Sequence, residues 1–377
     1  MQTLREALLN RPKQISVAGT LIGDIKTYIQ TNYKIYSRGI ATRIDETNID
    51  KVCKFTLKNG TYFVDAKRGL LLDRNATSLT GGLPFVWRKC KNFSIIYNQN
   101  IITLEGGPEI IDGDLNIQTC QSLQTLSFSA KIVKGDFEVA NCTNLISLDT
   151  QTDNVTGTFD IRNCNNFKKL GTNISSVGTF WISDCKTFNT LEGCPKTISL
   201  NFTVYSCPEI KTLEKGPENV SGKYCCRSTG IRNLKGAPEK IKGDFNCSKC
   251  SLLETLEGGP KYVSGNFDCH DCISLQSLEG SPEIVSGSFD CSKCPSIKNL
   301  KGAPKEIGKD LNVSSCENLT SLECDTESVR VLYTSNCAKL YITNLENIPE
   351  IREGVYGYIN GNYGHFSQKR LQELYGK

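Results

Sequence analysis

Residues 256–277 read LEGGPKYVSGNFDCHDCISLQS, and residues 278–299 read LEGSPEIVSGSFDCSKCPSIKN. The second segment repeats the pattern of the first, which reveals an internal repeat of 22 residues. The leucine that opens each segment recurs along the chain at Leu104, Leu126, Leu148, Leu170, Leu191, Leu213, Leu234, Leu256, Leu278, Leu300 and Leu322. Ten consecutive steps of 21 or 22 residues without a large insertion predict a repeat architecture rather than separate globular domains.

Each repeat places apolar residues in fixed columns. Val263 follows the leading leucine by seven residues, and Phe267 then opens a short run that alternates between inward apolar and outward polar residues. Phe is the commonest residue in the column of Phe267, whereas the column of Cys269 also holds Val and Ile. Alternation with a period of two over so few residues predicts one short strand per repeat.

The composition agrees with a folded repeat protein. Apolar residues make up 38% of the chain and charged residues 22%, which is too apolar for a disordered chain. No uninterrupted apolar run approaches the length of about 18 residues that a membrane-spanning helix needs, so we expect no membrane partner. Because one short unit cannot bury its own apolar face but stacked units can, we predict a β-rich repeat solenoid with one short parallel strand per 22-residue coil.

The ends of the chain depart from the period. Residues 1–75, which include an expected helix over residues 3–9 and the strand-like residues 54–57 before an Asn-Gly turn, predict a small α/β cap or accessory module. We expect the solenoid over residues 76–350 and a C-terminal cap over residues 351–377. In this cap, we expect a last strand at residues 355–358 and a helix at residues 367–374 that begins at Ser367 as N-cap.

Residues 85–93 show the strand spacing of the repeat. We therefore predict a first coil there, with Cys90 in a cysteine column and an insertion of eight residues before Cys120.

The chain resembles a known repeat family. Residues 310–322, DLNVSSCENLTSL, read as L-x-V-x-x-C-x-x-L-x-x-L, a pattern similar to the leucine-rich repeat, and the phrase Leu-Glu-Gly-x-Pro resembles short repeats of bacterial and bacteriophage proteins. The likeness covers residues 80–345 and departs from the family where Phe replaces Leu and Cys replaces Asn. It implies a curved array with the sheet on the concave side, used for protein binding.

Cysteine is unusually frequent, with 19 in a chain that has only two His. One column, with Ser228 as its expected break, comprises Cys120, Cys142, Cys164, Cys185, Cys207, Cys250, Cys272, Cys294, Cys316 and Cys337. Three CxxC pairs, with 18 residues between successive pairs, also fit the ligand spacing of structural zinc: Cys247/Cys250, Cys269/Cys272 and Cys291/Cys294.

Buried thiols are the favoured interpretation of these columns, over zinc and over disulfides. One CxxC column exchanges Cys freely with Val and Ile, and the other continues through repeats that have no CxxC. A thiol behaves as a small buried apolar group with a weak S–H donor. The odd number of cysteines and the absence of a secretory signal at the start oppose disulfides, and they predict a reducing cytoplasmic location.

No catalytic constellation stands out, so we expect a protein that is not an enzyme and needs no cofactor or metal. Cys225, between Lys223 and Arg227, is the one cysteine at an outward strand position, where nearby cations would lower its pKa. A catalytic role for Cys225 is disfavoured because no His follows nearby to act as base. The net charge of +4 is too small to indicate nucleic-acid binding.

The outward strand positions define the expected sheet face. They carry eight carboxylates against three Lys or Arg, so we expect an acidic face that phosphate backbones avoid and that suits a basic or polar polypeptide. In the middle of this face stand residues of the types that dominate protein interfaces. The predicted partner-binding residues are Trp181, Tyr205, Arg162, Arg227, Asp160 and Thr203.

Two functions remain open at this point. The first is a non-enzymatic scaffold that binds a protein partner through the acidic sheet face. The alternative is a structural component of a larger assembly, such as a phage particle or a surface fibre, that makes its contacts through the chain ends and the N-terminal module. A lateral contact between Trp181 and Tyr205 that merely stiffens the sheet is the competing interpretation of the aromatic residues.

Overall fold

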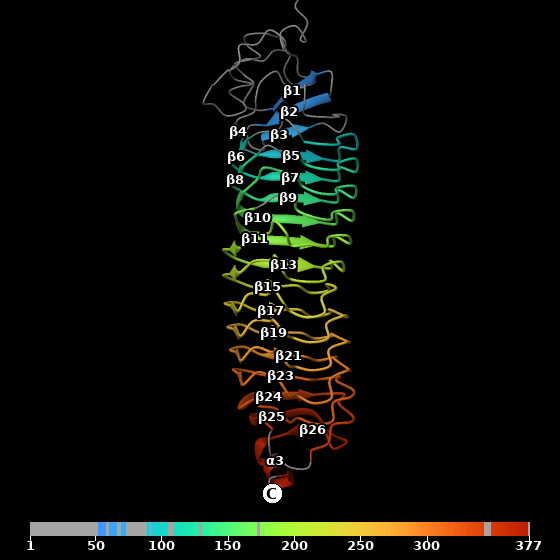
Figure 1. Ribbon diagram of the computed structural model, residues 1–377, viewed down its shortest axis with the longest axis vertical. Coiled ribbons are helices and arrows are strands. Elements are labelled where there is room, and N and C mark those ends of the chain that lie inside the picture. Colours follow the sequence, from blue (N-terminus) through green and yellow to red (C-terminus); the bar gives the residue numbers. More distant parts are fainter. Residues whose placement is uncertain are drawn as a thin grey trace, which may run out of the picture. The chain divides into compact units, whose positions relative to one another are not determined.

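The computed structural model describes residues 52–57, 60–65, 69–72, 89–90, 92–104, 109–127, 130–171, 174–342 and 348–375, with side chains from residue 92 onward. The helix expected over residues 3–9 lies outside the described residues, as does most of the expected N-terminal module. The chain divides into two compact units, Met1–Val177 and Gly178–Lys377. Each unit is a β-solenoid, which confirms the predicted fold class (Figure 1).

The first unit stacks its main strands in parallel at the repeat spacing. These strands are β5 (Phe93–Ile96), β7 (Leu115–Gln118), β9 (Phe137–Ala140) and β10 (Asn154–Arg162). A second row of short strands comprises β4 (Lys89–Cys90), β6 (Ile110–Ile111) and β8 (Ile132–Val133), and it continues into the start of β10. Leu115 lies opposite Phe137, and Phe137 lies opposite Phe159, so each coil places equivalent side chains on one another.

Antiparallel strands precede the first coil. They are β1 (Val52–Leu57), β2 (Gly60–Asp65) and β3 (Gly69–Leu72). Leu57 lies opposite Gly60, as expected for strands joined by a tight turn, and this confirms the strand predicted over residues 54–57. β3 pairs in parallel with β5, so Leu70 stands opposite Phe93.

The predicted frame of the first coil is wrong. Phe93, not Phe85, lies opposite Leu115, and Cys90 lies opposite Ile111 in the second row of strands. The step from Phe93 to Leu115 is one ordinary repeat, so there is no insertion at this point. The cysteine column is instead occupied here by the buried Asn98, whose side-chain oxygen accepts the backbone N–H of Ile101 at 2.8 Å.

The second unit continues the same construction through its own coils. The main strands are β11 (Ser176–Ser183), β13 (Phe202–Tyr205), β15 (Tyr224–Cys225), β17 (Phe245–Asn246), β19 (Phe267–Asp268), β21 (Phe289–Asp290), β23 (Leu311–Asn312), β24 (Ser328–Thr334) and β25 (Glu350–Ile359). The second row comprises β12 (Thr197–Ile198), β14 (Asn219–Val220), β16 (Lys240–Ile241), β18 (Tyr262–Val263), β20 (Ile284–Val285) and β22 (Glu306–Ile307). From β11 to β25, each main strand pairs in parallel with the next main strand, and the second row pairs in parallel from β12 to β22.

Aromatic rings form a continuous stack inside the second unit. Ring centroids are 4.6 Å apart for Phe202 and Tyr224, 5.2 Å for Tyr224 and Phe245, and 5.1 Å for Phe245 and Phe267. These spacings match the separation of about 4.8 Å between neighbouring strands, so successive coils place the rings in offset contact. Stacking of this kind, at about 1 kcal/mol per pair, explains why the column prefers Phe to Leu.

Thiols form the second internal column. The Sγ atoms of Cys250, Cys272 and Cys316 lie 3.3, 3.3 and 3.2 Å from the backbone oxygens of Cys226, Cys247 and Cys291 in the preceding coil. Each thiol therefore donates to a backbone carbonyl just beyond the end of a main strand. All of these thiols are buried, as the column pattern predicts.

Between Cys120 and Cys337, the break in this column lies at Thr229, not at Ser228 as the sequence count suggested. The Thr229 hydroxyl donates to the Cys226 oxygen of its own coil at 2.7 Å, the same oxygen that accepts the Cys250 thiol of the next coil. Ser228 is the preceding residue and has a φ of 55°. The residue before the thiol column is left-handed in other coils too, for example Asn141 (φ 56°) and Lys293 (φ 56°), because the chain turns sharply there.

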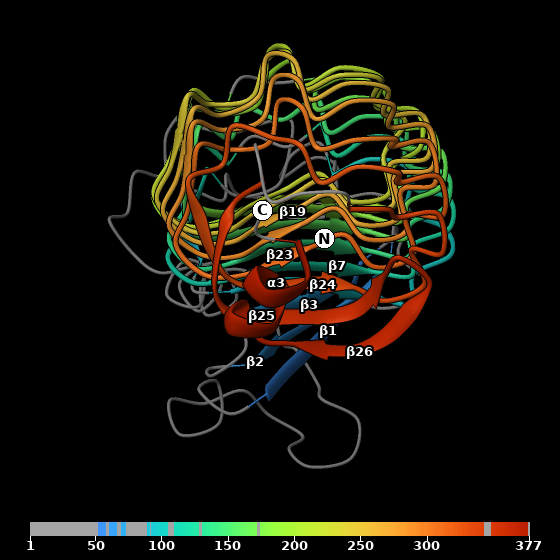
Figure 2. The same cartoon turned by 90° about the horizontal axis from the view of Figure 1, so that it is seen from below.

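The C-terminal end of the second unit confirms the predicted strand and helix. β25 includes the expected residues 355–358, β26 (Asn362–Phe366) pairs with it antiparallel, and α3 (Gln368–Tyr375) follows. The Ser367 hydroxyl accepts the N–H of Arg370 at 3.3 Å, as an N-cap does. α3 packs against β25 in the foreground of Figure 2. Among the described residues, no helix combines the length and the apolar character that a membrane span requires.

Candidate functional site

The first outward column of the sheet face is a ladder of Asp and Asn side chains. In the first unit, Asp114 Oδ1 accepts the backbone N–H of Asp136 at 2.9 Å, and Asp136 Oδ1 accepts that of Thr158 at 2.7 Å. In the second unit, Asp244 Oδ1 accepts the N–H of Asn266 at 3.0 Å. These side chains close hydrogen bonds between coils, so their carboxylates serve the fold itself.

The glycine before each strand belongs to the same arrangement. A Cβ atom at Gly135 would lie 2.0 Å from Asp114 Oδ1 and 2.8 Å from the Gly113 carbonyl carbon. Side chains are therefore excluded at this position by the neighbouring coil. Gly265 stands in the same relation to Asp244, at 2.4 Å.

Side chains in the second outward column of the second unit also form hydrogen bonds with neighbours on the same face. Asp268 Oδ1 accepts the N–H of His270 at 3.0 Å and lies 2.7 Å from its Nδ1, while Oδ2 accepts the Asn246 amide at 3.0 Å. Asp290 Oδ2 accepts the Asn312 amide at 3.0 Å. The acidic residues counted in the sequence are thus engaged by neighbours on the same face.

Asp160 and Arg162 lie on β10 of the first unit. Arg162 Nη1 is 3.0 Å from Asp160 Oδ2, and Arg162 Nη2 also forms an ion pair with Glu138. Burial raises the pKa of Asp160, which the Arg162 charge opposes and the Glu138 charge reinforces. The guanidinium of Arg162 is therefore already committed to two carboxylates.

The other predicted residues lie together on the second unit. Trp181 stands opposite Thr203 in the strand register, and Ser183 stands opposite Tyr205. Trp181 is 41% exposed, whereas Thr203 is only 8% exposed and offers little surface. The Arg227 guanidinium lies 5.6 Å from the centre of the Tyr205 ring, within the range of a cation–π contact. We call Trp181, Thr203, Tyr205 and Arg227 the aromatic patch.

Trp181 has no partner that would account for its exposed ring. Within the part of the chain that the structure describes, its indole forms neither a ring contact nor a hydrogen bond. The lateral ring contact with Tyr205 that was the competing interpretation is therefore not seen among the described residues, and the indole N–H remains available as a donor.

Cys225, beside the aromatic patch, does not have the lowered pKa that its cationic neighbours suggested. Burial raises the pKa of the Cys225 thiol, and the opposing effects of the Arg227 backbone and charge do not reverse this. The protonated thiol predominates at neutral pH, and a protonated thiol is a weak nucleophile.

One group of aromatic residues was missed in the sequence. Tyr333 and Tyr356 continue the second outward column, since Tyr333 lies opposite Asn312 and Tyr356 opposite Tyr333. Their rings are 5.8 Å apart, and Tyr356 stacks on His365 at 4.2 Å. The step from Leu311 to Leu332 is 21 residues, so a count in steps of 22 misses Tyr333 as the next member of this column. The strand register shows its position directly.

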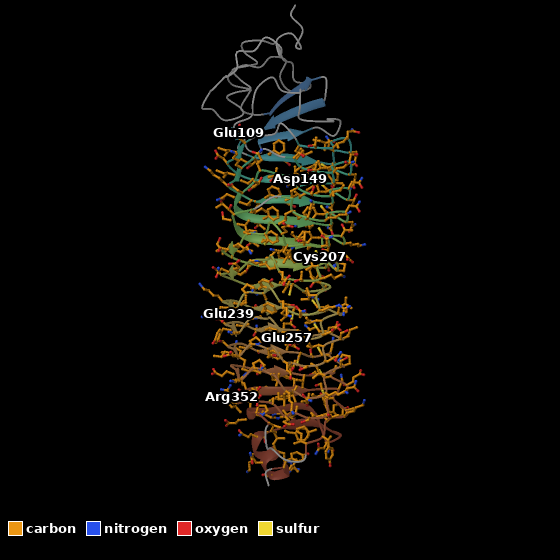
Figure 3. The ribbon with its side chains drawn as sticks, in the orientation of Figure 1. Glu109, Asp149, Cys207, Glu239, Glu257 and Arg352 are labelled. Carbon is orange, nitrogen blue, oxygen red and sulfur yellow. The ribbon has the colours of Figure 1, made fainter. Side chains whose placement is uncertain are left out.

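The flanks of the coils carry charges that pair between neighbours. Glu239, labelled in Figure 3, forms an ion pair with Lys261 at 3.2 Å, and Lys196 pairs with Glu218 at 3.0 Å. Within the described residues, no group of three or more His, Cys, Asp or Glu side chains could hold a metal ion.

These features define the class of protein as a parallel β-solenoid with stacked rings and a thiol column. No family model matches the chain, and neither the comparison with curated proteins nor that with solved structures found a significant match. The resemblance to leucine-rich repeats stays a prediction.

Proposed function

We propose that this protein is a non-enzymatic scaffold of the leucine-rich-repeat type that binds a polypeptide partner through its sheet face. The observation that carries this proposal is the exposed and unpartnered Trp181 beside Tyr205 and Arg227. Many other polar side chains of the face are hydrogen-bonded or ion-paired with their neighbours, so we expect the aromatic patch to supply the contacts to a partner. Asp160 and Arg162 of the first unit offer less, because they are already paired.

The energy of the contact depends on Trp181. Covering an exposed indole of this size removes apolar surface from water and contributes about 2 kcal/mol or more, the range of an interface hot spot. Tyr205 adds an apolar body with a polar tip, and the short side chains around it would let a partner approach closely.

The proposed setting is a reducing cytoplasm. The seventeen cysteines whose side chains are described are all free thiols, and all but Cys225 and Cys324 are buried. Oxidising surroundings would favour disulfides in a chain this rich in cysteine, whereas the thiol column uses each S–H as a hydrogen-bond donor.

The test is affinity capture of partners from the native host, comparing the wild type with Trp181→Ala and Tyr205→Ala. Tyr341→Ala is the matched control, because Tyr341 is 65% exposed but lies outside the aromatic patch. We expect capture to fall with the first two variants and to persist with the control. Equal capture by all four proteins would refute the proposed binding face.

A second candidate function is supported by β26. This strand is exposed at Asn362, Tyr363 and His365, and its pairing with β25 is the only one that the described strand registers show for it. A free strand edge is a template for pairing with another chain. Assembly through this edge would make the protein a structural component of a larger particle or fibre.

A further inference from the structure

Most charged side chains on the sheet face of the second unit form ion pairs or hydrogen bonds within the chain. Lys223 Nζ lies 2.9 Å from Asp244 Oδ2, and Arg330 Nη2 lies 2.7 Å from Asp310 Oδ2. His270 lies against Asp268. Cations of the chain therefore neutralise Asp244 and Asp310, whereas Asp268 and Asp290 are engaged by hydrogen bonds.

Arg227 is the exception. Within the described part of the chain, no carboxylate lies within ion-pair distance of its guanidinium, and its Nε is buried without a hydrogen-bond partner. Its contact is instead with the face of the Tyr205 ring. A guanidinium held over a ring keeps its outer N–H groups aligned, and a carboxylate is the group that fits such a fork best.

We propose that Arg227 binds a carboxylate of the partner, so that the aromatic patch recognises an acidic, extended peptide segment. This inference rests on the proposed function and names the chemistry of the partner. It reverses the charge that the sequence suggested, since Lys223 and Arg330 are paired with Asp244 and Asp310, whereas Arg227 has no carboxylate partner within the described residues.

The spacing of the aromatic patch sets the spacing within the peptide. Trp181, Tyr205 and Arg227 come from three successive coils, and Arg227 stands two strand positions further along than Trp181. Two coil steps of about 4.8 Å and two residues of about 3.3 Å place Trp181 and Arg227 roughly 12 Å apart. An extended peptide covers this distance in about three or four residues.

The recognised segment is therefore an apolar or aromatic residue separated from an Asp or Glu by about three or four positions. The apolar side chain covers the Trp181 ring, and the carboxylate meets the Arg227 guanidinium. The indole N–H of Trp181 donates to a peptide carbonyl between them.

The test uses a library of random peptides displayed on phage and selected against the full-length protein, followed by binding measurements on the selected peptides made synthetically. We expect enrichment of peptides with the acidic and apolar pair. Arg227→Gln should weaken their binding about tenfold or more, and Trp181→Ala should do the same. Lys223→Gln is the control, because Lys223 is paired with Asp244 and should change binding less than about twofold.

Two further variants keep the result interpretable. Arg227→Lys retains the charge without the fork and should bind better than Arg227→Gln, and Arg227→Glu should select basic peptides instead. Peptides that need Trp181 but are indifferent to Arg227, or basic peptides selected by the wild type, would overturn the acidic-segment inference and leave the proposed function intact. If no selected peptide depends on Trp181, or if none is selected, both fail.

Discussion

Tyr224 stands in a column made mainly of Phe, between Phe202 and Phe245. Its side chain is fully buried, and its hydroxyl has no hydrogen-bond partner within the described structure. A buried hydroxyl that has lost water without gaining a partner lowers stability. The ring therefore stabilises the fold by stacking, whereas the unpaired hydroxyl destabilises it.

We predict that Tyr224→Phe raises the free energy of unfolding by about 1 kcal/mol, because it removes the unsatisfied hydroxyl and keeps the stacked ring. Urea unfolding followed by circular dichroism measures this change. Phe245→Tyr is the reverse control and should lower the free energy of unfolding by a similar amount. A less stable Tyr224→Phe variant would show that the hydroxyl has a bonding role.

At the scale of the coil elements, the thiol column couples stability to pH. Burial raises the pKa of Cys250 from an ordinary 9.0 to about 11 and that of Cys294 to about 12. Burial, and after it the nearby thiols, also raise the pKa of Cys269 in the neighbouring column. The folded protein thus holds these protons at a pH where the unfolded chain releases them, so the free energy of unfolding should fall between about pH 9 and pH 12.

The replacement of Cys269 by Val tests this coupling, because Val and Ile occupy the same column in other coils. Between about pH 8 and pH 10, we expect the free energy of unfolding of Cys269→Val to fall by about 1.4 kcal/mol less than that of the wild type. Urea titrations at the two pH values measure both proteins. If both lose the same stability, the thiol does not contribute to the pH dependence.

At the scale of the whole molecule, the open edge of β26 bears on assembly. Tyr363 is 69% exposed on this strand. A lysine on an edge strand opposes pairing with a second chain through its charge and hydration. If the protein assembles through β26, size-exclusion chromatography with light scattering should show concentration-dependent association that Tyr363→Lys abolishes.

Tyr341→Lys is the matched control, since it adds the same charge at an exposed tyrosine outside β26 and should leave association unchanged. A wild type that stays monomeric at all concentrations would contradict assembly through this edge and leave the scaffold function as the remaining proposal.

Much of the fold was predictable because stacking makes each coil face copies of its own pattern. The ring at Phe267 needed only the ring of the next coil, and the thiol of Cys272 needed only a carbonyl that every coil supplies. The predicted alignment of the first coil was wrong because it relied on Cys90 alone. In the structure, the buried Asn98 occupies the position that a thiol has in other coils. One cysteine is not enough to align a coil with the repeat, because the alignment also needs the other columns to match.

The candidate site was predictable only in part. The outward position of Trp181 follows from strand alternation, and its exposure agrees. The sequence could not distinguish Arg162, which meets Glu138 and Asp160, from Arg227, which meets a ring. Both are arginines at the same position of the repeat, and they differ in the side chains that adjacent strands bring within reach.

The sequence by itself therefore determined the 22-residue period, the β-solenoid and the columns of rings and thiols, because a stacked repeat turns one local pattern into the whole core. Tertiary structure alone decided the start of the first coil, the partners of the carboxylates, and the absence of an ion-pair partner for Arg227 within the described residues. These depend on contacts between residues about one repeat apart, such as Lys223 and Asp244, whose geometry is set only when one coil lies on the next.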